Sequence, residues 1–471
     1  MSCRSHHILQ FPARVKMSLN FSAASLKQIL SDDLSVDQHS SIYVAFSGGL
    51  DSHVLLHALS CLAADYSFSL EAIHIDHSLH SKSTQWANHC RAVCDGLGVP
   101  LTVKKVTLAR LKGESLEAQA REARYSALAG FLPENGICMT AQHINDQAET
   151  VVLQLLRGAG VHGMAAMPAA KVFAAGRMLR PLLGFSRKSL HDYATRHGLE
   201  WVDDPSNLDQ RFDRNYLRNE ILPALRERWP GMDKSISRSA KHAASAATML
   251  DEIGMSDLQY CQALCNHFFP PSVAYLRADK LVSLSTIHQK NALRCWVRMN
   301  GLAVPGDKRL QTLINLLNES PEKGTVCWQE GAFRLYNKMI WLCDSPELLL
   351  PVDRKIKWNP YIPLQLQNTG QVLQAMKVAG EGIAVSAIGD SALTVRFRQG
   401  GEICRMPGEH GSKTLKKLLQ DLAVPPWLRA SLPLIYLHDE LIAVSYLWSN
   451  SLYLPAVDEE GYIFSIHQAI S

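Results

Sequence analysis

Residues 47–52 (S-G-G-L-D-S) bring together two adjacent glycines, two hydroxyls and one carboxylate. The apolar run 43–46 before them predicts a strand, and the helix-period segment 53–64 after them predicts a helix. Two glycines allow consecutive backbone N–H groups to converge on one point, where the helix dipole adds partial positive charge. A loop of this kind predicts a site for phosphate or pyrophosphate.

The carboxylate distinguishes this loop from a Walker A loop, which requires a lysine that residues 47–52 lack. Asp51 suits magnesium or a ribose better than phosphate. The order S-G-G-x-D-S resembles the loop of the N-type ATP pyrophosphatases, which cleave ATP to AMP and pyrophosphate. The alternative is an ordinary strand-to-helix turn capped by Asp51 or Ser52.

A second chemical segment, residues 140–150 (T-A-Q-H-I-N-D-Q-A-E-T), leads from a predicted strand into a helix. Asp146 and Glu149 are three residues apart, so their carboxylates share one face of the first helical turn. The pair could hold magnesium or bind an ammonium group. Alternatively, it only complements the helix dipole. A glycine loop on a neighbouring strand favours the chemical interpretation.

A third segment, residues 114–125, places Glu117, Arg121 and Arg124 along one helical stripe. The stripe is either a solvated ladder of salt bridges or a face that binds substrate. Alanines between the charged residues keep this helix thin, which would allow a bulky substrate to approach closely.

A fourth segment follows W-V-D-D-P-S-N at residues 201–207 and carries Arg211, Arg214 and Arg218 at helical spacing beside aromatic residues. A basic stripe interleaved with aromatic rings suits a splayed nucleotide and its phosphates. The alternative is a charged face over a core-facing aromatic pair.

The elements that position these segments alternate between strand and helix. Apolar runs at 70–75, 101–106 and 137–140 are separated by helical patterns at 85–96 and 116–131. This rhythm predicts an α/β fold with a doubly wound, Rossmann-like parallel sheet, in which ligands bind beyond the carboxyl ends of the strands. The chemical segments lie at those ends.

The rest of the chain indicates further domains. We expect an N-terminal extension, a catalytic α/β domain, a helical middle domain, a proline-marked linker and a small α+β C-terminal domain. Their predicted bounds are 1–36, 37–225, 226–350, 351–390 and 391–471. The first sixteen residues lack periodicity and could lie outside the mature protein.

Composition narrows the class of protein. The chain has 471 residues, 47% hydrophobic, 20% charged, with a net charge of +4, which permits a nucleic-acid partner without requiring one. The 11 cysteines include no C-x-x-C, which argues against structural zinc or a redox dithiol. Their odd number and uneven spacing favour a reduced, cytoplasmic protein. No stretch of about 18 apolar residues occurs, so we expect no membrane segment.

The C-terminal module is locally basic. Residues 396–429 contain seven Lys or Arg against three acids, a balance that suits contacts to an RNA backbone. The sequence G-E-H-G-S-K-T at 408–414 is similar to a Walker A loop, but Ser412 replaces its glycine. His74, His77 and His80 have the spacing of a metal site, yet they follow a strand, whose alternation would separate the side chains.

Taken in order, these segments resemble the tRNA(Ile)-lysidine synthetase family. The segments are A-F-S-G-G-L-D-S, I-H-I-D-H-S-L, E-A-Q-A-R-E-A-R-Y, T-A-Q-H-I-N-D-Q-A-E-T, R-M-L-R-P-L-L, W-V-D-D-P-S-N with R-F-D-R-N-Y-L-R, and G-S-K-T-L-K-K-L-L-Q-D-L-A-V-P-P-W-L-R. The resemblance covers the N-terminal domain nearly whole and the C-terminal domain, and the middle domain only loosely.

The resemblance implies a PP-loop ligase that joins L-lysine to the wobble cytidine of tRNA(Ile) with a CAU anticodon. ATP would adenylate the cytosine oxygen with loss of pyrophosphate, Mg²⁺ would assist, and the lysine amine would then displace AMP. A homodimer is one assembly compatible with it.

Site residues follow from the resemblance and from the patterns above. For ATP they are Ser47, Gly48, Gly49, Leu50, Asp51, Ser52 and His77. For catalysis they are Asp51, Asp146, Glu149, Arg121 and Arg214, with Asp51 and Asp146 also assigned to the metal. For lysine or tRNA they are His143, Arg124, Arg211, Arg218, Lys413, Lys416, Lys417 and Arg429.

One departure and two rivals stay open. The family pattern H-x-D-D-Q reads H-I-N-D-Q here, so Asn145 carries no charge, and we place the catalytic burden on Asp146. A tRNA thiolase of the same ATP pyrophosphatase class would need a reactive cysteine beside the loop. A non-catalytic RNA-binding protein would not need Asp51, Asp146 and Glu149 together.

Overall fold

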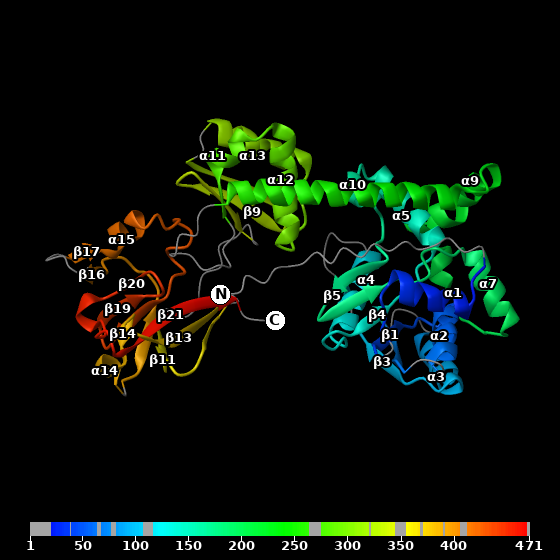
Figure 1. Cartoon of the computed structure of the whole chain (residues 1–471), viewed down its shortest axis with the longest axis horizontal. Helices are drawn as coiled ribbons and strands as arrows, with labels where there is room; N and C mark the ends of the chain where they lie inside the picture. Colours follow the sequence, from blue (N-terminus) through cyan, green and yellow to red (C-terminus); the bar gives the residue numbers. More distant parts are fainter. Residues whose placement is uncertain are drawn as a thin grey trace. The chain divides into compact units, whose positions relative to one another are not determined.

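The structure, a computed structural model, describes residues 20–37, 39–63, 67–76, 82–106, 116–262, 275–319, 322–343, 355–367, 371–389, 391–405 and 412–468. It forms two compact units, Met1–Thr248 and Met249–Ser471, shown in Figure 1. Within the described part of the chain, no helix is both long and apolar enough to cross a membrane.

The first unit is the α/β domain. Its strands are β1 (Ser41–Ala45), β2 (Ser69–Asp76), β3 (Leu101–Lys105), β4 (Ile137–Met139), β5 (Ala170–Phe173) and β6 (Gly176–Leu179). Its α-helices are α1 (Ala23–Gln28), α2 (Leu50–Ala63), α3 (Ser83–Leu97), α4 (Leu116–Ala129), α5 (Ile144–Leu156), α6 (Val161–Met164), α7 (Arg187–Arg196), α8 (Asp213–Tyr216), α9 (Leu222–Arg228) and the start of α10 (Met232–Cys261). Short π and 3-10 segments are η1 (Ile29–Asp33), η2 (Pro205–Leu208) and η3 (Leu217–Ile221).

The six strands form one sheet in the order β3-β2-β1-β4-β6-β5. Every neighbouring pair is parallel except β5 with β6, so the predicted parallel, doubly wound sheet is confirmed, with an antiparallel strand at one edge. The chain runs from β1 through β2 to β3 on one side and then returns to β4 on the other. The strand order therefore reverses between β1 and β4, where sheets of this kind bind ligands.

Side chains alternate along the strands and pack into two cores, one on each face of the sheet. Ile42 and Val44 of β1 pack with α1, α2, α3 and α7, whereas Tyr43 and Ala45 face the smaller core that Leu128 of α4 completes. The sheet therefore lies between α4 and the helices near α2 (Figure 1). Both faces are covered, which explains why the strands read as nearly continuous apolar runs.

The predicted N-terminal extension ends earlier than residue 36. Phe21, Leu26 and Leu34 are fully buried in the core that contains α2 and α7, and Phe21 makes edge contacts with Phe185 and Tyr193. Residues 21–34 are part of the α/β domain, because their apolar side chains fill the space beside α7.

The second unit contains more β-structure than the sequence predicted. Its strands are β7 (Tyr275–Arg277), β8 (Lys323–Trp328), β9 (Gly331–Tyr336), β10 (Met339–Cys343), β11 (Lys355–Trp358), β12 (Leu364–Leu366), β13 (Gln371–Ala379), β14 (Ile383–Ala384), β15 (Leu393–Arg396), β16 (Ile403–Arg405), β17 (Ser412–Thr414), β18 (Leu434–Leu437), β19 (Glu440–Val444), β20 (Trp448–Ser449) and β21 (Glu460–Gln468). Its helices are the end of α10, α11 (Ala278–Ser283), α12 (Thr286–Met299), α13 (Asp307–Glu319), α14 (Val385–Ile388), α15 (Leu415–Asp421) and the 3-10 segment η4 (Ser451–Tyr453).

The predicted helical middle region is confirmed in α11, α12 and α13, and it also contains a four-stranded sheet of order β7-β10-β9-β8, on which these helices pack. The expected linker 351–390 instead supplies β11 to a five-stranded sheet and β12, β13 and β14 to a four-stranded sheet, in which the long strand β13 pairs with β21. Pro360 and Pro363 lie in the turn between β11 and β12.

Candidate functional site

The glycine loop lies where β1 ends and α2 begins, at the reversal of strand order. Gly48 has a φ of +81°, in the region that favours glycine. A Cβ atom at Gly48 would lie 2.9 Å from the sulfur of Cys90, so the loop rests directly on α3. The hydroxyls of Ser47 and Ser52 lie 3.0 Å apart and brace the turn from inside. The first N–H groups of α2 have no intrahelical acceptor and are available to an anion.

Cys90 beneath this loop is not set up as a nucleophile. Burial raises the pKa of its thiol to about 12, and the neighbouring Cys94 adds to the effect. A thiol with such a pKa is protonated at neutral pH, whereas sulfur transfer requires a thiolate. The described part of the chain therefore offers no reactive cysteine under the loop for a thiolase.

The acidic segment forms helix α5, and His143 caps its N-terminus. The backbone N–H of Asp146 donates to Nδ1 of His143 at 3.3 Å, while the backbone N–H of His143 donates to Oδ2 of Asp146 at 2.9 Å. This reciprocal cap fixes both side chains. It also places the proton of a neutral imidazole on Nε2.

His143 joins the acidic helix to the glycine loop. Its Nε2 lies 3.6 Å from Oδ2 of Asp51, and its side chain is only 3% exposed. Burial alone would lower the pKa of His143, but the charges of Asp146 and Asp51 outweigh it and raise the pKa. Segments separated by about ninety residues thus meet at one imidazole, as the strand order requires.

Two arginines neutralise the two acids of α5. Arg214 donates to Glu149 at 2.9 Å and to Asp146 at 3.4 Å. Arg218 donates to Glu149 at 2.6 and 2.8 Å and to Asp146 at 2.9 Å. Although burial alone would raise it, the charges of His143 and Arg214 lower the pKa of Asp146. The acids therefore act as a fixed anchor for guanidinium groups.

The predicted arginine stripe divides because of local helix geometry. Arg214 lies in the single turn α8 and Arg218 in the π-helical η3, and both reach the acids of α5. Arg211 precedes α8, is largely exposed and pairs with Asp209 at 2.6 Å. The three arginines therefore do not form one continuous face toward a nucleotide.

Asp51 is the carboxylate that best fits a cation. Its Oδ1 is buried and has no hydrogen-bond partner, whereas both oxygens of Asp146 already accept hydrogen bonds. An unpartnered buried carboxylate oxygen beside a phosphate-binding loop is what a magnesium ligand requires. Within the described residues, no cluster of three or more His, Cys, Asp or Glu could hold a metal without substrate oxygens.

Asn145 stands where the family pattern H-x-D-D-Q has its first aspartate, and both ends of its side-chain amide are hydrogen-bonded. Its side-chain amide donates to Asp233 of α10 at 2.9 Å, and its carbonyl oxygen accepts from the backbone N–H of Arg187 at 2.9 Å. Asp233 also pairs with Arg226. Asn145 thus ties α5 to the starts of α7 and α10, and an aspartate there would set two carboxylates against each other.

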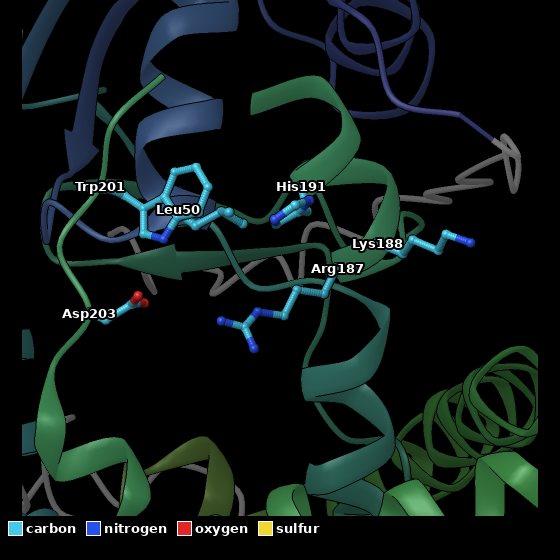
Figure 2. A pocket seen from close by; sticks show the side chains of 6 residues that line it. All are labelled: Leu50, Arg187, Lys188, His191, Trp201 and Asp203. Atoms are coloured by element: carbon cyan, nitrogen blue, oxygen red, sulfur yellow. The ribbon is translucent and has the colours of Figure 1, made fainter. Parts of the chain in front are cut away.

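A cavity of about 420 Å³ opens beside the glycine loop. It is lined by Leu50, Arg187, Lys188, His191, Trp201 and Asp203. Figure 2 shows Arg187 extending into the space in front of Asp203, with Trp201 and Leu50 forming an apolar wall and Lys188 pointing away. Sequence reasoning noted the segment around Trp201 but missed the basic residues at the start of α7, which follow no motif.

The loop and the cavity are connected through the chain segment before Asp203. The backbone N–H of Val202 donates to the carbonyl of Gly48 at 3.0 Å. His53 of α2 bonds through Nδ1 to the carbonyl of Glu200 at 2.7 Å. These contacts hold residues 200–203 against the glycine loop, which makes the cavity and the loop one site.

Other predicted residues lie elsewhere in the fold. Arg121 is exposed on α4 and lies over the ring of Tyr125. Arg124, on the same helix, interacts electrostatically with Asp204. His77 lies outside the described residues, as does His80.

The predicted basic residues of the C-terminal module belong to the second unit. Lys413 and Lys417 both approach Asp421, at 3.9 and 3.1 Å, and Lys416 is exposed on α15. Arg429 donates to the hydroxyl of Tyr336 and to the carbonyl of Val424, both at 2.8 Å. Arg429 therefore already has partners within the unit.

Three parts of the chain match models of known protein families. Residues 19–225 match the model of the PP-loop domain, residues 276–341 that of the TilS substrate binding domain, and residues 393–465 that of the TilS substrate C-terminal domain. The chain is 41% identical over 422 residues to the tRNA(Ile)-lysidine synthase of Coxiella burnetii, with 89% of this chain and 91% of that protein covered.

Two further relatives carry the same name. The tRNA(Ile)-lysidine synthase of Alkalilimnicola ehrlichii is 40% identical over 86% of this chain and 89% of its own length. That of Pseudomonas aeruginosa is 39% identical over 85% of this chain and 88% of its own length. With this identity along nearly the whole length, and with the glycine loop, His143 and the acidic helix assembled as described, the chain belongs to the tRNA(Ile)-lysidine synthase family.

Proposed function

We propose that this protein joins L-lysine to the wobble cytidine of a tRNA(Ile) that carries a CAU anticodon. The observation that carries the proposal is the junction of the glycine loop with α5, where Asp51 lies 3.6 Å from His143. One segment suits a triphosphate and the other positions charged groups at the reacting base. The product base would pair with A instead of G, which changes decoding from methionine to isoleucine.

In the first step, the cytosine O2 attacks the α-phosphate of ATP, a P–O bond forms, and pyrophosphate leaves. The N–H groups at the start of α2 would hold the triphosphate and the departing pyrophosphate. Asp51, with its unpartnered oxygen, would hold Mg²⁺, which offsets the negative charge on the phosphates. Asp146 stays a predicted second ligand, although its oxygens already accept hydrogen bonds from Arg218 and His143.

In the second step, the side-chain amine of lysine attacks C2 of the activated base, and AMP leaves with the C–O electron pair. The ammonium must first lose a proton, because only the free amine is a nucleophile. Asp146 is poorly suited to take this proton, since His143 and Arg214 lower its pKa. His143 is not free to take it either, because its Nδ1 accepts the backbone N–H of Asp146 and its Nε2 faces Asp51.

The cavity beside the loop suits the amino acid. Arg187 could pair with the carboxylate of lysine, Asp203 with its α-ammonium, and Trp201 could cover its methylene chain. Asp146 and Glu149 are less suited to bind lysine than the sequence predicted, because Arg214 and Arg218 already occupy them.

The proposal is tested by incubating the protein with ATP, Mg²⁺, radiolabelled lysine and unmodified tRNA(Ile), then digesting the RNA. We expect label on the anticodon nucleotide only when ATP is present, and none with an otherwise identical tRNA that has guanosine at the wobble position. Absence of lysine from the RNA would reject the ligase activity, and incorporation of sulfur from a sulfur donor would favour a thiolase.

A further inference from the structure

Three cationic side chains from three elements surround the ring of Tyr125 on α4. The guanidinium of Arg121, also on α4, lies 5.1 Å from the ring centroid. The ammonium of Lys171 on β5 lies 5.1 Å from the same centroid and 5.6 Å from that of Phe173. Arg180, which directly follows β6, is close enough for its charge to act on the Tyr125 hydroxyl. We call Arg121, Tyr125, Lys171 and Arg180 the Tyr125 cluster.

Arg180 is the buried part of the Tyr125 cluster. Its side chain is 3% exposed, and it donates through Nη1 to the carbonyl of Pro168 at 2.8 Å. Its Nη2 contacts the sulfur of Met178, and its Nε is buried without a hydrogen-bond partner. A buried guanidinium N–H without an acceptor is costly, and Arg180 therefore holds a positive charge beneath Tyr125 that its carbonyl and sulfur contacts only partly offset.

Among the side chains that the structure describes, no carboxylate is seen to pair with Arg121, Lys171 or Arg180 of the Tyr125 cluster. Burial would raise the pKa of the Tyr125 hydroxyl, but the charges of Arg121 and Arg180 outweigh it and lower that pKa. Burial and the charge of Arg180 lower the pKa of Lys171. Three like charges held this closely repel each other, and an anion would relieve the repulsion.

The strand register places the Tyr125 cluster at the ligand-binding edge of the sheet. Val44 pairs with Met139 and Met139 pairs with Leu179, so Arg180 lies level with Ala45, just before the glycine loop. Because β4 separates β1 from β6, the ends of these strands are about 10 Å apart. The Tyr125 cluster is thus beside the triphosphate site but displaced from it.

We propose that Arg121 and Lys171, with the hydroxyl of Tyr125, bind a backbone phosphate of the RNA next to the wobble nucleotide, and that the buried Arg180 adds positive charge beneath them. The inference rests on the proposed function, because it requires an RNA substrate at this edge of the sheet. A phosphate has the charge and acceptor oxygens that the cluster lacks, and guanidinium groups bind it in a bidentate manner. The glycine loop already accounts for the triphosphate of ATP. The Tyr125 cluster lies two strand positions away from that loop, so a phosphate of the RNA suits it better than a phosphate of the same ATP. Such a contact would fix the register of the anticodon loop.

Lys171→Gln is the direct test, because Lys171 is partly exposed on an edge strand and its replacement leaves the core intact. Lys104→Gln is the matched control, since Lys104 also lies over a phenylalanine ring, at 5.7 Å from Phe131, but on β3 at the opposite edge of the sheet. For both variants and the wild type, the affinities for tRNA(Ile) and for ATP are measured at several salt concentrations.

For Lys171→Gln we expect roughly tenfold weaker tRNA binding at low salt, unchanged ATP binding, and a salt dependence whose logarithmic slope is smaller by about one. Lys104→Gln should behave as the wild type. Equal tRNA binding by both variants would overturn the inference, and a loss of ATP affinity with unchanged tRNA affinity would assign the cluster to the triphosphate and overturn the RNA assignment.

Two further measurements distinguish the loss of a phosphate contact from a loss of folded protein and from a failure of catalysis. Arg180→Lys keeps the charge of the buried group, so it should retain more tRNA affinity than Arg180→Met at equal folded fraction. Lysine transfer by the wild type is measured in parallel, because tRNA binding does not require catalysis. If Lys171→Gln weakens tRNA binding while the wild type transfers no lysine, the proposed function fails and the phosphate site stands.

Discussion

At the residue scale, the role of each carboxylate in the site depends on whether its oxygens already accept hydrogen bonds from the protein. Glu149 is 1% exposed and accepts hydrogen bonds from both Arg214 and Arg218. Its carboxylate therefore holds these two arginines in position and is not available to react. Asp51 is the opposite case, with an unpartnered oxygen beside the glycine loop. Carboxylates that look equivalent in the sequence therefore divide into one suited to a cation and two suited to hold arginines.

Replacing Asp51 by asparagine should reduce pyrophosphate release in the absence of lysine by roughly 10²-fold or more, because the charge opposite the phosphates is lost. The fold should be retained, since the side chain contacts only His143 closely among the described charged groups. The rate of pyrophosphate release from ATP with tRNA is the measurement. Asp95→Asn, at an exposed position of α3, is the control. Wild-type release by Asp51→Asn would remove Asp51 from the first step.

Asn145 is not a weakened catalytic acid but a connector with two neutral hydrogen bonds. Asn145→Asp should lower the free energy of unfolding by about 1–3 kcal/mol, because a carboxylate would face Asp233 in place of the amide donor. Urea unfolding measures the change. The double variant with Asp233→Asn should recover part of the loss, as a donor again faces an acceptor. Unchanged stability of Asn145→Asp would contradict this role.

At the element scale, the order of the strands decides which segments meet. The loop after β1 and the segment after β4 lie side by side because β1 and β4 are hydrogen-bonded neighbours, although β2 and β3 come between them in sequence. The short α8 and the π-helical η3 then present Arg214 and Arg218 to α5. The glycine loop depends in turn on α3, whose Cys90 leaves room only for a glycine at position 48.

The two glycines of the loop should respond differently to substitution. Gly48→Ala should cost about 1–3 kcal/mol of unfolding free energy, because its φ is +81° and the new Cβ would lie 2.9 Å from the sulfur of Cys90. Gly49→Ala is the matched control, since its nearest contacts would be ordinary at 3.5 and 3.8 Å. Thermal or urea unfolding of both variants distinguishes them. Equal stability of the two would show that the loop does not depend on the conformation of Gly48.

At the scale of the whole molecule, the sequence predicted the helices and strands that have a clear local apolar pattern. It did not predict features that depend on contacts between segments far apart in the chain. The runs at residues 101–106 and 137–140 are strands β3 and β4, and β1, β2 and α2 lie within a few residues of their predicted ends. The hairpin of β5 and β6 was not foreseen, because neither strand has a distinctive period. Neither was the Tyr125 cluster, since Lys171 and Arg180 lie about fifty residues beyond Tyr125 and follow no motif. Strand pairing, not sequence spacing, brings them together.

Burial of neutral histidines should make the first unit sensitive to acid. Burial is the largest cause that lowers the pKa of His53, His57 and His74 from 6.5. The unfolded chain binds more protons below that pH, so the stabilisation is complete above pH 6.5 and is lost as the pH falls toward the folded pKa values. His143 has a raised pKa, so its own contribution to stability is largest at low pH and is lost as the pH rises. It is one group against the three buried histidines.

We therefore expect the urea concentration at half-unfolding to decrease as the pH is lowered from about 7.5 to about 5.5. The decrease should be smaller in His57→Gln than in the wild type. Circular dichroism during urea titration measures both. A midpoint that stays constant or rises toward lower pH would contradict this assignment.

The central claim is that the glycine loop and the α5 segment together activate a tRNA base with ATP before lysine arrives. The most direct test mixes the protein, Mg²⁺, tRNA(Ile) with a CAU anticodon and ATP labelled at the α-phosphate, with lysine omitted, and then adds unlabelled lysine. The account predicts label on the wobble nucleotide before lysine and its release as AMP afterwards. Label that never reaches the RNA, or that remains on it after lysine is added, would contradict the account.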